Sequence, residues 1–393
     1  MAVEIKQVET RRELREFIRF NYRLYKDNPY AVPDLLEDML ATLGRRTNPA
    51  LEFCDAAYFL AKKDGQTVGR VAAIINHRAN EIWKERAVRF GWIDFIDDPE
   101  VSSALIETVA DWGSARGMEM IEGPLGFTDM DSEGCLIEGF EELSTMATIY
   151  NYPYYAQHFE RLGMEKAADW IELNMVVPDR VPERLVRMSD LVSKRLGLHV
   201  RKIKSIREVK KTGIGYKIFE LINEAFSPLF GFVPMTKRQI DQYVKTYLQF
   251  IDLRMVSLVE TAQGELVAVG ISMPSLSRTL QKAHGRLLPW GWFHFLKTLV
   301  LKQYPDTLDL LLVGVRPDYQ NKGVNALLFT DLIPVYQQLG FKYVETNIEL
   351  EQNRKVQSQW QYFETRQHKR RRCYRRLLRS QFRIQNSELR SEE

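Results

Sequence analysis

The stretch that decides the fold is LLLVGVRPDYQNKGVNALLFTDLI, from Leu310 to Ile333. It opens with an apolar run, LLLVGV, which is typical of a buried strand. A polar turn from Arg316 to Gly323 follows. Apolar residues then recur at helical spacing, at Leu328, Leu332, Val335, Tyr336 and Leu339. A strand, a glycine-containing turn and a helix in this order direct free backbone N–H groups at an anion. The stretch therefore predicts an anion-binding turn.

Length and composition indicate a globular protein of two domains. The chain has 393 residues, and domains usually have about 100–200. The segment from Met1 to Phe17 lacks the apolar core of a signal peptide. The three cysteines are scattered and have no metal-ligand spacing. The most membrane-like segment, Leu287 to Leu301, is shorter than the roughly 20 apolar residues of a spanning helix. We therefore expect a cytoplasmic protein with no transmembrane segment and no metal.

The two halves of the chain repeat one order of predicted elements: helices, a β-hairpin, a strand, a helix, a strand, a helix and a strand. The hairpins turn at residues 63–65 and 262–264. The match is one of pattern more than of identity. A proline-containing break near Val177 separates the halves. We expect an α/β (α+β) protein of two lobes, residues 1–178 and 179–393, each with a mixed, mostly antiparallel sheet flanked by helices.

This order of elements resembles the GCN5-related N-acetyltransferase (GNAT) superfamily, here as a tandem pair. More closely, the chain is similar to a group of bacterial two-lobed GNAT proteins. The phrases that carry this likeness are GPLGFTDMDSEGCLIEGF (Gly123–Phe140), FGFVPMT (Phe230–Thr236) and GRLLPWGWFHFLK (Gly285–Lys297). The resemblance extends over almost the whole chain and is firmest from Leu310 to Phe363.

The superfamily signature is Gln/Arg-x-x-Gly-x-Gly/Ala at the start of the central helix. Its six positions here are Gln320, Asn321, Lys322, Gly323, Val324 and Asn325. The resemblance implies that the N–H groups of this turn hold the pyrophosphate of acetyl-CoA or another acyl-CoA. It also implies that pantetheine pairs with the exposed backbone of Val313, Gly314 and Val315. Asn325 replaces a small residue and narrows the cradle, although asparagine tolerates unusual backbone angles.

The family's last helix usually reads N-x-x-A-x-x-L-Y, and its tyrosine protonates the leaving thiolate. Here Asn353 leads the helix and Trp360 takes the tyrosine position, where an indole cannot serve as the acid. Tyr362 is the substitute, or else a packed aromatic. The base candidates are Glu345 and Glu349, whose even spacing predicts a shared sheet face. They could equally be a solvated pair.

The first half departs from the family at the matching turn. Asp97-Asp98-Pro99-Glu100 has no glycine, and its acidic charge would repel a pyrophosphate. Phe159 to Met164 still keeps the shape of the family's last helix. We expect the first lobe to lack the cradle and to form a wall of the substrate site. NYPYY, from Asn151 to Tyr155, could add aromatic walls. The loop Gly123–Phe140 could recognise a cationic amine through its acids, or its glycines could simply serve turns; the acids are Asp129, Asp131, Glu133 and Glu138.

Two further segments allow more than one interpretation. The aromatic insert, Leu287 to Leu301, could be core, line a substrate tunnel or make an interfacial contact. The strip from Arg366 to Arg379 holds eight Lys and Arg residues and no acid. It could bind phosphates, or be an edge strand that its charges protect from pairing.

The favoured function is an acyl-CoA-dependent N-acyltransferase that acetylates a small amine or amino-acid-like acceptor held between the lobes. A first alternative is a Fem-like transferase that takes its acyl group from aminoacyl-tRNA, for which the basic strip would be the binding surface. A second is a non-catalytic module that binds CoA, lipid or protein, which the missing tyrosine at Trp360 would favour. DNA is not an expected partner.

Overall fold

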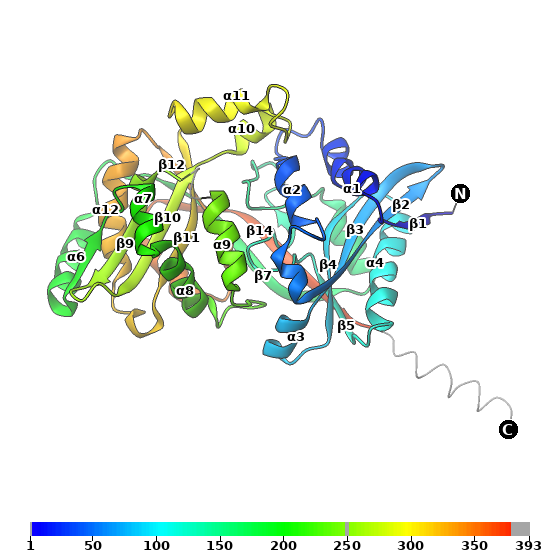
Figure 1. Cartoon of the computed structure of the whole chain (residues 1–393), viewed down its shortest axis with the longest axis horizontal. Helices are drawn as coiled ribbons and strands as arrows, with labels where there is room; N and C mark the ends of the chain where they lie inside the picture. The colour runs from blue at the N-terminus through cyan, green and yellow to red at the C-terminus, as the bar shows by residue number, and fades with distance from the viewer. Residues whose placement is uncertain (1, 248–250, 379–393) are drawn as a thin grey trace.

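The computed structural model of the chain describes residues 2–247 and 251–378. Its two lobes lie side by side, the first half on the right and the second on the left (Figure 1). The elements of the first half are β1 (Glu4–Gln7), α1 (Arg11–Leu24), α2 (Leu36–Thr42), β2 (Cys54–Lys63), β3 (Gln66–Asn76), α3 (His77–Trp83), β4 (Ala87–Phe95), α4 (Pro99–Ser114), β5 (Met120–Gly123), β6 (Cys135–Glu138), α5 (Tyr154–Arg161) and β7 (Glu165–Val176).

The second half repeats this order and adds an insert between its third and fourth strands. Its elements are α6 (Glu183–Leu196), β8 (Leu198–Arg201), α7 (Ile206–Thr212), α8 (Ile214–Phe226), α9 (Lys237–Tyr247), β9 (Val256–Thr261), β10 (Leu266–Pro274), α10 (Ser277–Lys282), α11 (Gly291–Phe295), β11 (Thr307–Val315), α12 (Asn325–Gln338), β12 (Tyr343–Thr346), β13 (Glu349–Leu350), α13 (Arg354–Gln357) and β14 (Thr365–Leu377). Among the described residues, no helix has the length and apolarity to cross a membrane.

One mixed sheet runs through both lobes, in the order β1-β2-β3-β4-β5-β14-β7-β12-β11-β10-β9-β8. Its pairs are antiparallel except β4 with β5 and β11 with β12. In the first lobe α4 packs on one face, and in the second α12 packs on one face and α8 on the other. The expected two-lobed α/β architecture, with mixed and mostly antiparallel strands, is confirmed.

The lobes exchange their last strands. The terminal strand β14 lies between β5 and β7, at the centre of the sheet, where Figure 1 shows it crossing between the lobes. Strand β7 of the first half pairs in turn with β12 of the second. The interpretation of the basic strip as an edge strand is therefore wrong. The division at residue 178 stays a prediction, because each segment completes the other's sheet.

The charges of β14 are buried or paired instead of being solvated. Lys369 and Arg371 on β14 and Glu172 on β7 are each fully buried. The Glu172 carboxylate lies 3.1 Å from Lys369 Nζ and 2.5 Å from Arg371 Nε. Burial alone would raise the pKa of Glu172, but the two cations overcome that effect and lower it to about 2. Other basic side chains of the strand pair with acids of both halves. The last residue of the predicted strip, Arg379, lies outside the described residues.

Candidate functional site

Strands β11 and β12 part within the second lobe. They pair in parallel only over Thr307–Leu310 and Tyr343–Thr346. Beyond this point Asn347 closes the pairing, because its N–H donates to the Leu310 carbonyl (3.2 Å) and its Nδ2 to the Leu311 carbonyl (3.3 Å). The segment from Leu311 to Val315 continues against β10 alone. Its other edge is thus open to an extended ligand that hydrogen-bonds like a strand.

The turn that follows β11 presents a row of free donors. Within the described part of the chain, no acceptor is in hydrogen-bond reach of the backbone N–H groups of residues 321–325. No side chain caps the N-terminus of α12 either. The first bond that closes the helix runs from Ala326 N–H to the Gly323 carbonyl (3.0 Å). Consecutive free N–H groups at a helix N-terminus attract an anion through their partial positive charge.

The side chains around this turn support its shape. Gln320 Nε2 donates to the Val315 carbonyl (3.1 Å) and so ties the turn to the strand. The Asn325 side chain is directed at Gln359, with 3.3 Å between Nδ2 and Oε1. The Lys322 ammonium lies 5.3 Å from the centre of the Tyr319 ring. Lys322 is exposed, so it adds a positive charge next to the free N–H groups.

Gly323 is required by its backbone and by a neighbouring helix. Its φ is +78°, which favours glycine. A Cβ here would also lie 3.1 Å from Met188 Sδ and 3.3 Å from Val192 Cγ2, both on α6. The glycine therefore lets the turn pack against α6 while its N–H stays free. Asn321 also has a positive φ, of +60°.

The two predicted bases, Glu345 and Glu349, lie on opposite faces of the sheet. Glu345 is in register with Asn174 of β7, and Glu349 is in register with Ile171. Residues an odd number apart on one strand point to opposite faces, so the prediction of a shared face is wrong. The chain leaves the strand between Thr346 and Glu349, and this break changes the alternation.

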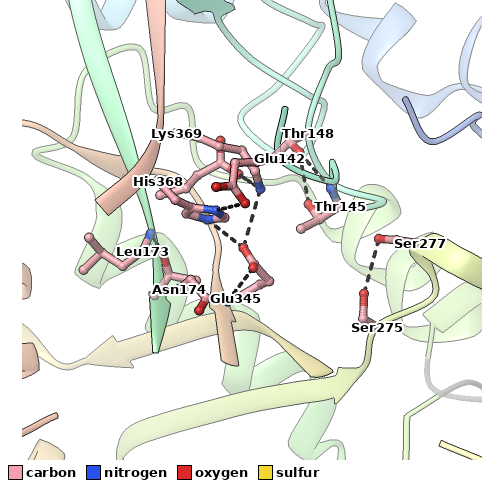
Figure 2. Close-up of polar contacts among 12 residues, drawn as sticks. Glu142, Thr145, Thr148, Leu173, Asn174, Ser275, Ser277, Glu345, His368 and Lys369 are labelled. Atoms are coloured by element: carbon pink, nitrogen blue, oxygen red, sulfur yellow. Dashed lines mark hydrogen bonds and ion pairs between the residues drawn. The ribbon is translucent and has the colours of Figure 1, made fainter. Parts of the chain in front are cut away.

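Each predicted base is also engaged with a neighbour. Glu349 accepts from Trp360 Nε1 at 2.8 Å, on the α12 face of the sheet, and burial raises its pKa to about 7. Glu345 accepts from Asn174 Nδ2 (2.8 Å), and its other oxygen lies 2.8 Å from His368 Nε2 and 3.5 Å from Lys369 Nζ. Figure 2 shows Glu345 and Glu142 on two sides of the His368 ring. His368 is isolated in the sequence, and only the fold brings it to these acids.

The predicted last helix is short. Asn353 caps α13, which ends at Gln357, and a 3₁₀ turn covers Ser358–Tyr362. Trp360 is buried against Phe329, and its indole N–H is used by Glu349. The ring of Tyr362 is half-buried beneath the Arg184 guanidinium, 5.2 Å from its centre. The acid role of Tyr362 stays a prediction.

Sequence reasoning missed Asp309, because it lies inside an apolar strand, TLDLLLVGV. It is 3% exposed, and neither of its oxygens makes a hydrogen bond of normal geometry among the described residues, although the Ser275 hydroxyl lies close enough to lower its pKa. Burial raises its pKa to about 7, and the nearby Glu345 adds to this effect. Met273 is in register with Asp309 and lines the large cavity of the protein, so the carboxylate lies on the cavity face of the sheet. A lone carboxylate with a pKa near 7 is suited to accept a proton.

The large cavity lies between the two lobes and has a volume of about 1110 Å³. It reaches the point where β11 leaves β12, because Asn347, Leu311 and Leu312 line it. A bulge in the pairing with β10 places these two consecutive leucines at the cavity. The wall from the second lobe combines apolar residues with polar ones; the apolar residues include Ile203, Ile218, Val256, Ile271 and Met273, and the polar ones Arg278, Gln281, His284 and Arg286.

The wall from the first lobe is charged, and it holds five aspartates and four cations: Asp27, Asp34, Asp38, Asp94, Asp131, Arg19, Arg23, Lys26 and Arg70. Asp94 there is held by Arg70, with 2.6 Å between Nη2 and Oδ2, and by the hydroxyl of Tyr25. Burial raises the pKa of Asp34 to about 6 and that of Asp131 to about 7. A cation that entered would favour the charged forms of these carboxylates. Of the acids predicted on the loop Gly123–Phe140, Asp131 lines the cavity, whereas Asp129 accepts from the backbone N–H of Val233.

Solved structures of known proteins share this architecture. A tandem GNAT protein from the clavulanic acid biosynthesis pathway aligns with 96% of this chain and 99% of its own, with a TM-score of 0.55 and 11% identity. A GCN5-related N-acetyltransferase from Sphaerobacter thermophilus covers 96% of both chains, with a TM-score of 0.51 and 12% identity. This chain has the tandem GNAT fold. The resemblance seen in its sequence is thereby confirmed at the level of the fold.

Two curated proteins are similar in sequence to this tandem GNAT chain. Protein YghO of Escherichia coli (strain K12) is 29% identical over 326 residues, which are 82% of this chain and 80% of that protein. The bacterial ceramide synthase of Caulobacter vibrioides (strain NA1000 / CB15N) is 28% identical over 324 residues, 82% of each chain. No family model matches the chain.

The first GNAT lobe has the same strand–turn–helix unit with its donors occupied. Asp98 caps α4 by accepting from the Glu100 N–H (2.9 Å), and Lys63 pairs with both acids. Beyond its pairing with β5, strand β4 also finds a hydrogen-bond acceptor, because the Phe95 N–H donates to the hydroxyl of Tyr155 (3.1 Å). The acidic turn and the segment NYPYY thus provide, in the first lobe, the hydrogen-bond acceptors that are lacking at the corresponding described positions of the second lobe.

Proposed function

We propose that this protein is an N-acyltransferase that moves the acyl group of an acyl-CoA to the amine of a long-chain amino compound. The observation that carries the proposal is the continuity of three features. The free N–H groups of residues 321–325, the open edge of Leu311–Val315 and the cavity at Leu311 form one path. A phosphate, an extended pantetheine arm and an acyl group have that same order in acyl-CoA.

The donor would bind along this path from the outside inward. The pyrophosphate would accept hydrogen bonds from the N–H groups of residues 321–325, with Lys322 beside it. The pantetheine amides would pair with the backbone of Val313, Gly314 and Val315, whose other edge is taken by β10. The thioester would then reach Leu311 and Asn347, at the mouth of the cavity.

The two walls of the cavity favour an amphiphilic acceptor. The apolar residues of the second-lobe wall would cover a hydrocarbon chain, and the carboxyls of Asp34 and Asp131 in the charged first-lobe wall would attract an ammonium group. The volume of about 1110 Å³ exceeds the roughly 300–1,000 Å³ of ordinary ligand pockets. The likeness to a ceramide synthase supports an acceptor of this type, because a ceramide is the amide of a long-chain amino alcohol. It changes the expected acceptor from an amino-acid-like amine to a lipid-like one.

Asp309 is the proposed base. It would take a proton from the ammonium group, after which the nitrogen lone pair attacks the thioester carbon. The C–N bond forms, the nitrogen loses its second proton to water, the C–S bond breaks, and the leaving thiolate takes a proton from Tyr362 or water. Glu345 has a carboxylate oxygen 2.8 Å from His368 Nε2, and its negative charge would raise the pKa of Asp309 without contacting the substrate. Asp309 replaces Glu345 and Glu349 in this role because Glu349 lies on the opposite face of the sheet.

The alternative of a tRNA-dependent transferase loses its supporting feature. The basic strip is the central strand β14, and Lys369 and Arg371 are fully buried in it. They pair with Glu172, so they are not available to phosphates. The non-catalytic alternative remains as an outcome of the experiment below.

Calorimetry and thiol release test the proposal together. Titration with acetyl-CoA and with long-chain acyl-CoA measures binding, and release of free CoA with amines of increasing chain length measures transfer. Lys322→Glu should weaken acyl-CoA binding about tenfold, because it puts a negative charge beside the pyrophosphate. Lys217→Glu, at an exposed position of α8, is the matched control.

Three outcomes of this experiment would count against the proposal. If the wild-type protein binds no acyl-CoA, the donor assignment is wrong. If Lys322→Glu binds as well as Lys217→Glu, the turn is not the cradle. Binding without thiol release for any amine would favour the non-catalytic alternative.

A further inference from the structure

The aromatic insert, Leu287 to Leu301, presents an unusual apolar surface. Six of the thirteen large hydrophobic side chains that are exposed in the described part of the chain belong to it. Leu288 and Trp290 are 72% and 76% exposed, far more than packing against the protein's own core would leave. The other four are Trp292, Phe293, Val300 and Leu301. A cluster of this kind usually marks a contact with a partner or a membrane.

The opposite side of the insert packs onto the cavity wall. Phe295 and Leu299 contact the buried cluster that contains Met273 and Leu280. Figure 1 shows α10 and α11 lying along one side of the molecule, above the space between the lobes. Gln281, His284 and Arg286, which lead into the insert, line the cavity. The exposed apolar surface therefore lies beside an opening of the cavity.

The chain segment that contains the insert carries charges of a single sign. From Leu266 to Pro305 the chain contains five Lys and Arg residues and no Asp or Glu. Lys282, Arg286, Lys297 and Lys302 are exposed, although Lys302 also lies 3.4 Å from Asp252. The Lys297 ammonium lies 4.7 Å from the centre of the Phe293 ring, at the border of the apolar surface. Tryptophan beside lysine and arginine suits the boundary between lipid headgroups and acyl chains.

We propose that the aromatic insert is an interfacial anchor that seats the mouth of the cavity on an anionic membrane. Its apolar side chains would enter the headgroup region, and the surrounding cations would attract anionic lipids. A long-chain amine could then pass from the bilayer into the cavity without crossing water. The membrane contact stands on the insert alone, whereas this passage rests on the proposed function.

Vesicle flotation tests the anchor on the full-length protein. Vesicles of phosphatidylcholine are compared with vesicles that contain about one third phosphatidylglycerol. Wild-type protein should bind the anionic vesicles at least tenfold more tightly than the neutral ones. Trp290→Glu should weaken this binding at least tenfold. Leu191→Glu, at a 63% exposed position on α6, should bind like the wild type, and melting temperatures check that all three proteins fold.

Two results would overturn the anchor. One is a wild-type protein that does not float with anionic vesicles, or a Trp290→Glu protein that floats equally well. The other is a wild-type dimer in size-exclusion chromatography with light scattering that Trp290→Glu dissociates, because the surface would then bind a second copy of the chain.

Transfer assays separate the anchor from the reaction. Trp290→Glu should keep the wild-type rate with a short, water-soluble amine and lose at least tenfold with a long-chain amine embedded in vesicles. Equal losses with both amines would refute delivery from the membrane. Absence of transfer with any amine would refute the proposed function, and flotation alone would then decide the anchor.

Discussion

The turns before the two central helices, Asp97–Glu100 and Gln320–Asn325, have the same place in the fold and opposite chemistry. In the first lobe Asp98 caps the helix and Tyr155 accepts from the strand before it. In the second lobe the N–H groups of residues 321–325 are free, and Leu311–Val315 keeps an open edge. The first lobe thus caps its helix with its own carboxylate, whereas the second lobe leaves the N–H groups at the same place without an acceptor among the described residues. The two lobes differ here in a few side chains, at the turn and on one strand.

The same contrast extends into the sheet. Pairing of β4 with β5 places Arg89 beside Glu122, and pairing of β11 with β12 places Asp309 beside Glu345 at the corresponding positions. In the first lobe burial raises the pKa of Glu122, and a cation opposes this effect, with 3.9 Å between Arg89 Nε and Glu122 Oε1. In the second lobe two carboxylates are neighbours, and one of them has a pKa of about 7. Each lobe thus has a carboxyl with a pKa of about 7, but in the second lobe this group, Asp309, lies on the strand before the open turn, whereas in the first lobe Asp131 lies on the loop Gly123–Phe140.

The largest expected effect comes from Asp309→Asn. Removal of the proposed base should lower kcat about 10²–10⁴-fold, with little change in the Kd of acyl-CoA. Wild-type kcat should rise as the pH passes about 7, since the base must be deprotonated, and the variant should lose this dependence. Steady-state kinetics from pH 5 to 9 measure both properties.

Two controls sharpen this test. Glu122→Gln changes the corresponding acid of the first lobe and should leave kcat and its pH profile unchanged; equal losses in both variants would refute the distinction between the lobes. Folding gives an independent readout. The folded pKa of Asp309 is raised above its unfolded value, so wild type loses stability as the pH rises from about 4 to about 7. Asp309→Asn should melt higher than wild type at pH 8 and nearly equal to it at pH 4.

The next effect concerns the strand that the first half supplies to the second lobe. Glu172→Gln on β7 should lower the free energy of unfolding by about 3–5 kcal/mol, because Lys369 and Arg371 would be left as buried charges without their anion. Chemical denaturation measures this change. Both lobes should unfold in one transition, since β7 and β14 each join the two halves. Loss of stability in only one of two resolved transitions would show that the lobes fold independently.

The smallest effect comes from the side chains that close the first lobe. The hydroxyl of Tyr154 donates to the Phe95 carbonyl at 2.5 Å. Tyr154→Phe should cost about 0.5–1.5 kcal/mol of stability, the usual contribution of one hydrogen bond. Calorimetry should show no change in acyl-CoA binding. A large change in binding would mean that the first lobe takes part in holding the donor.

Local patterns were enough to predict the strand, turn and helix from Leu310 to Ile333 and not enough to predict which sheet face carries each acid. The run Leu310–Val315, the turn and the helix occupy consecutive residues, so their arrangement follows from local propensity. Glu345 and Glu349 have the spacing of one strand face, but the chain leaves the strand at Asn347 and the spacing no longer applies. Asp309 could not be predicted as a site residue, because one acid in a long apolar run gives no periodic signal.

The basic strip shows a different failure. Its charge density is typical of an edge strand, yet β14 is central because it pairs with β5 and β7. The acids that neutralise it, among them Glu172 and Asp169, lie about two hundred positions earlier in the chain. Composition alone contains no information about such pairing.

The sequence by itself therefore determined the repeated order of elements, the acidic turn without glycine in the first lobe and the glycine-containing turn before the central helix in the second. These features depend on neighbouring residues, for which backbone propensity and local charge suffice. Only the tertiary structure decided that the lobes exchange strands, that Asp309 lies on the cavity face, and that a charged wall faces one with a large apolar part. Those features depend on contacts between distant segments, which exist only once burial and strand pairing have brought the segments together.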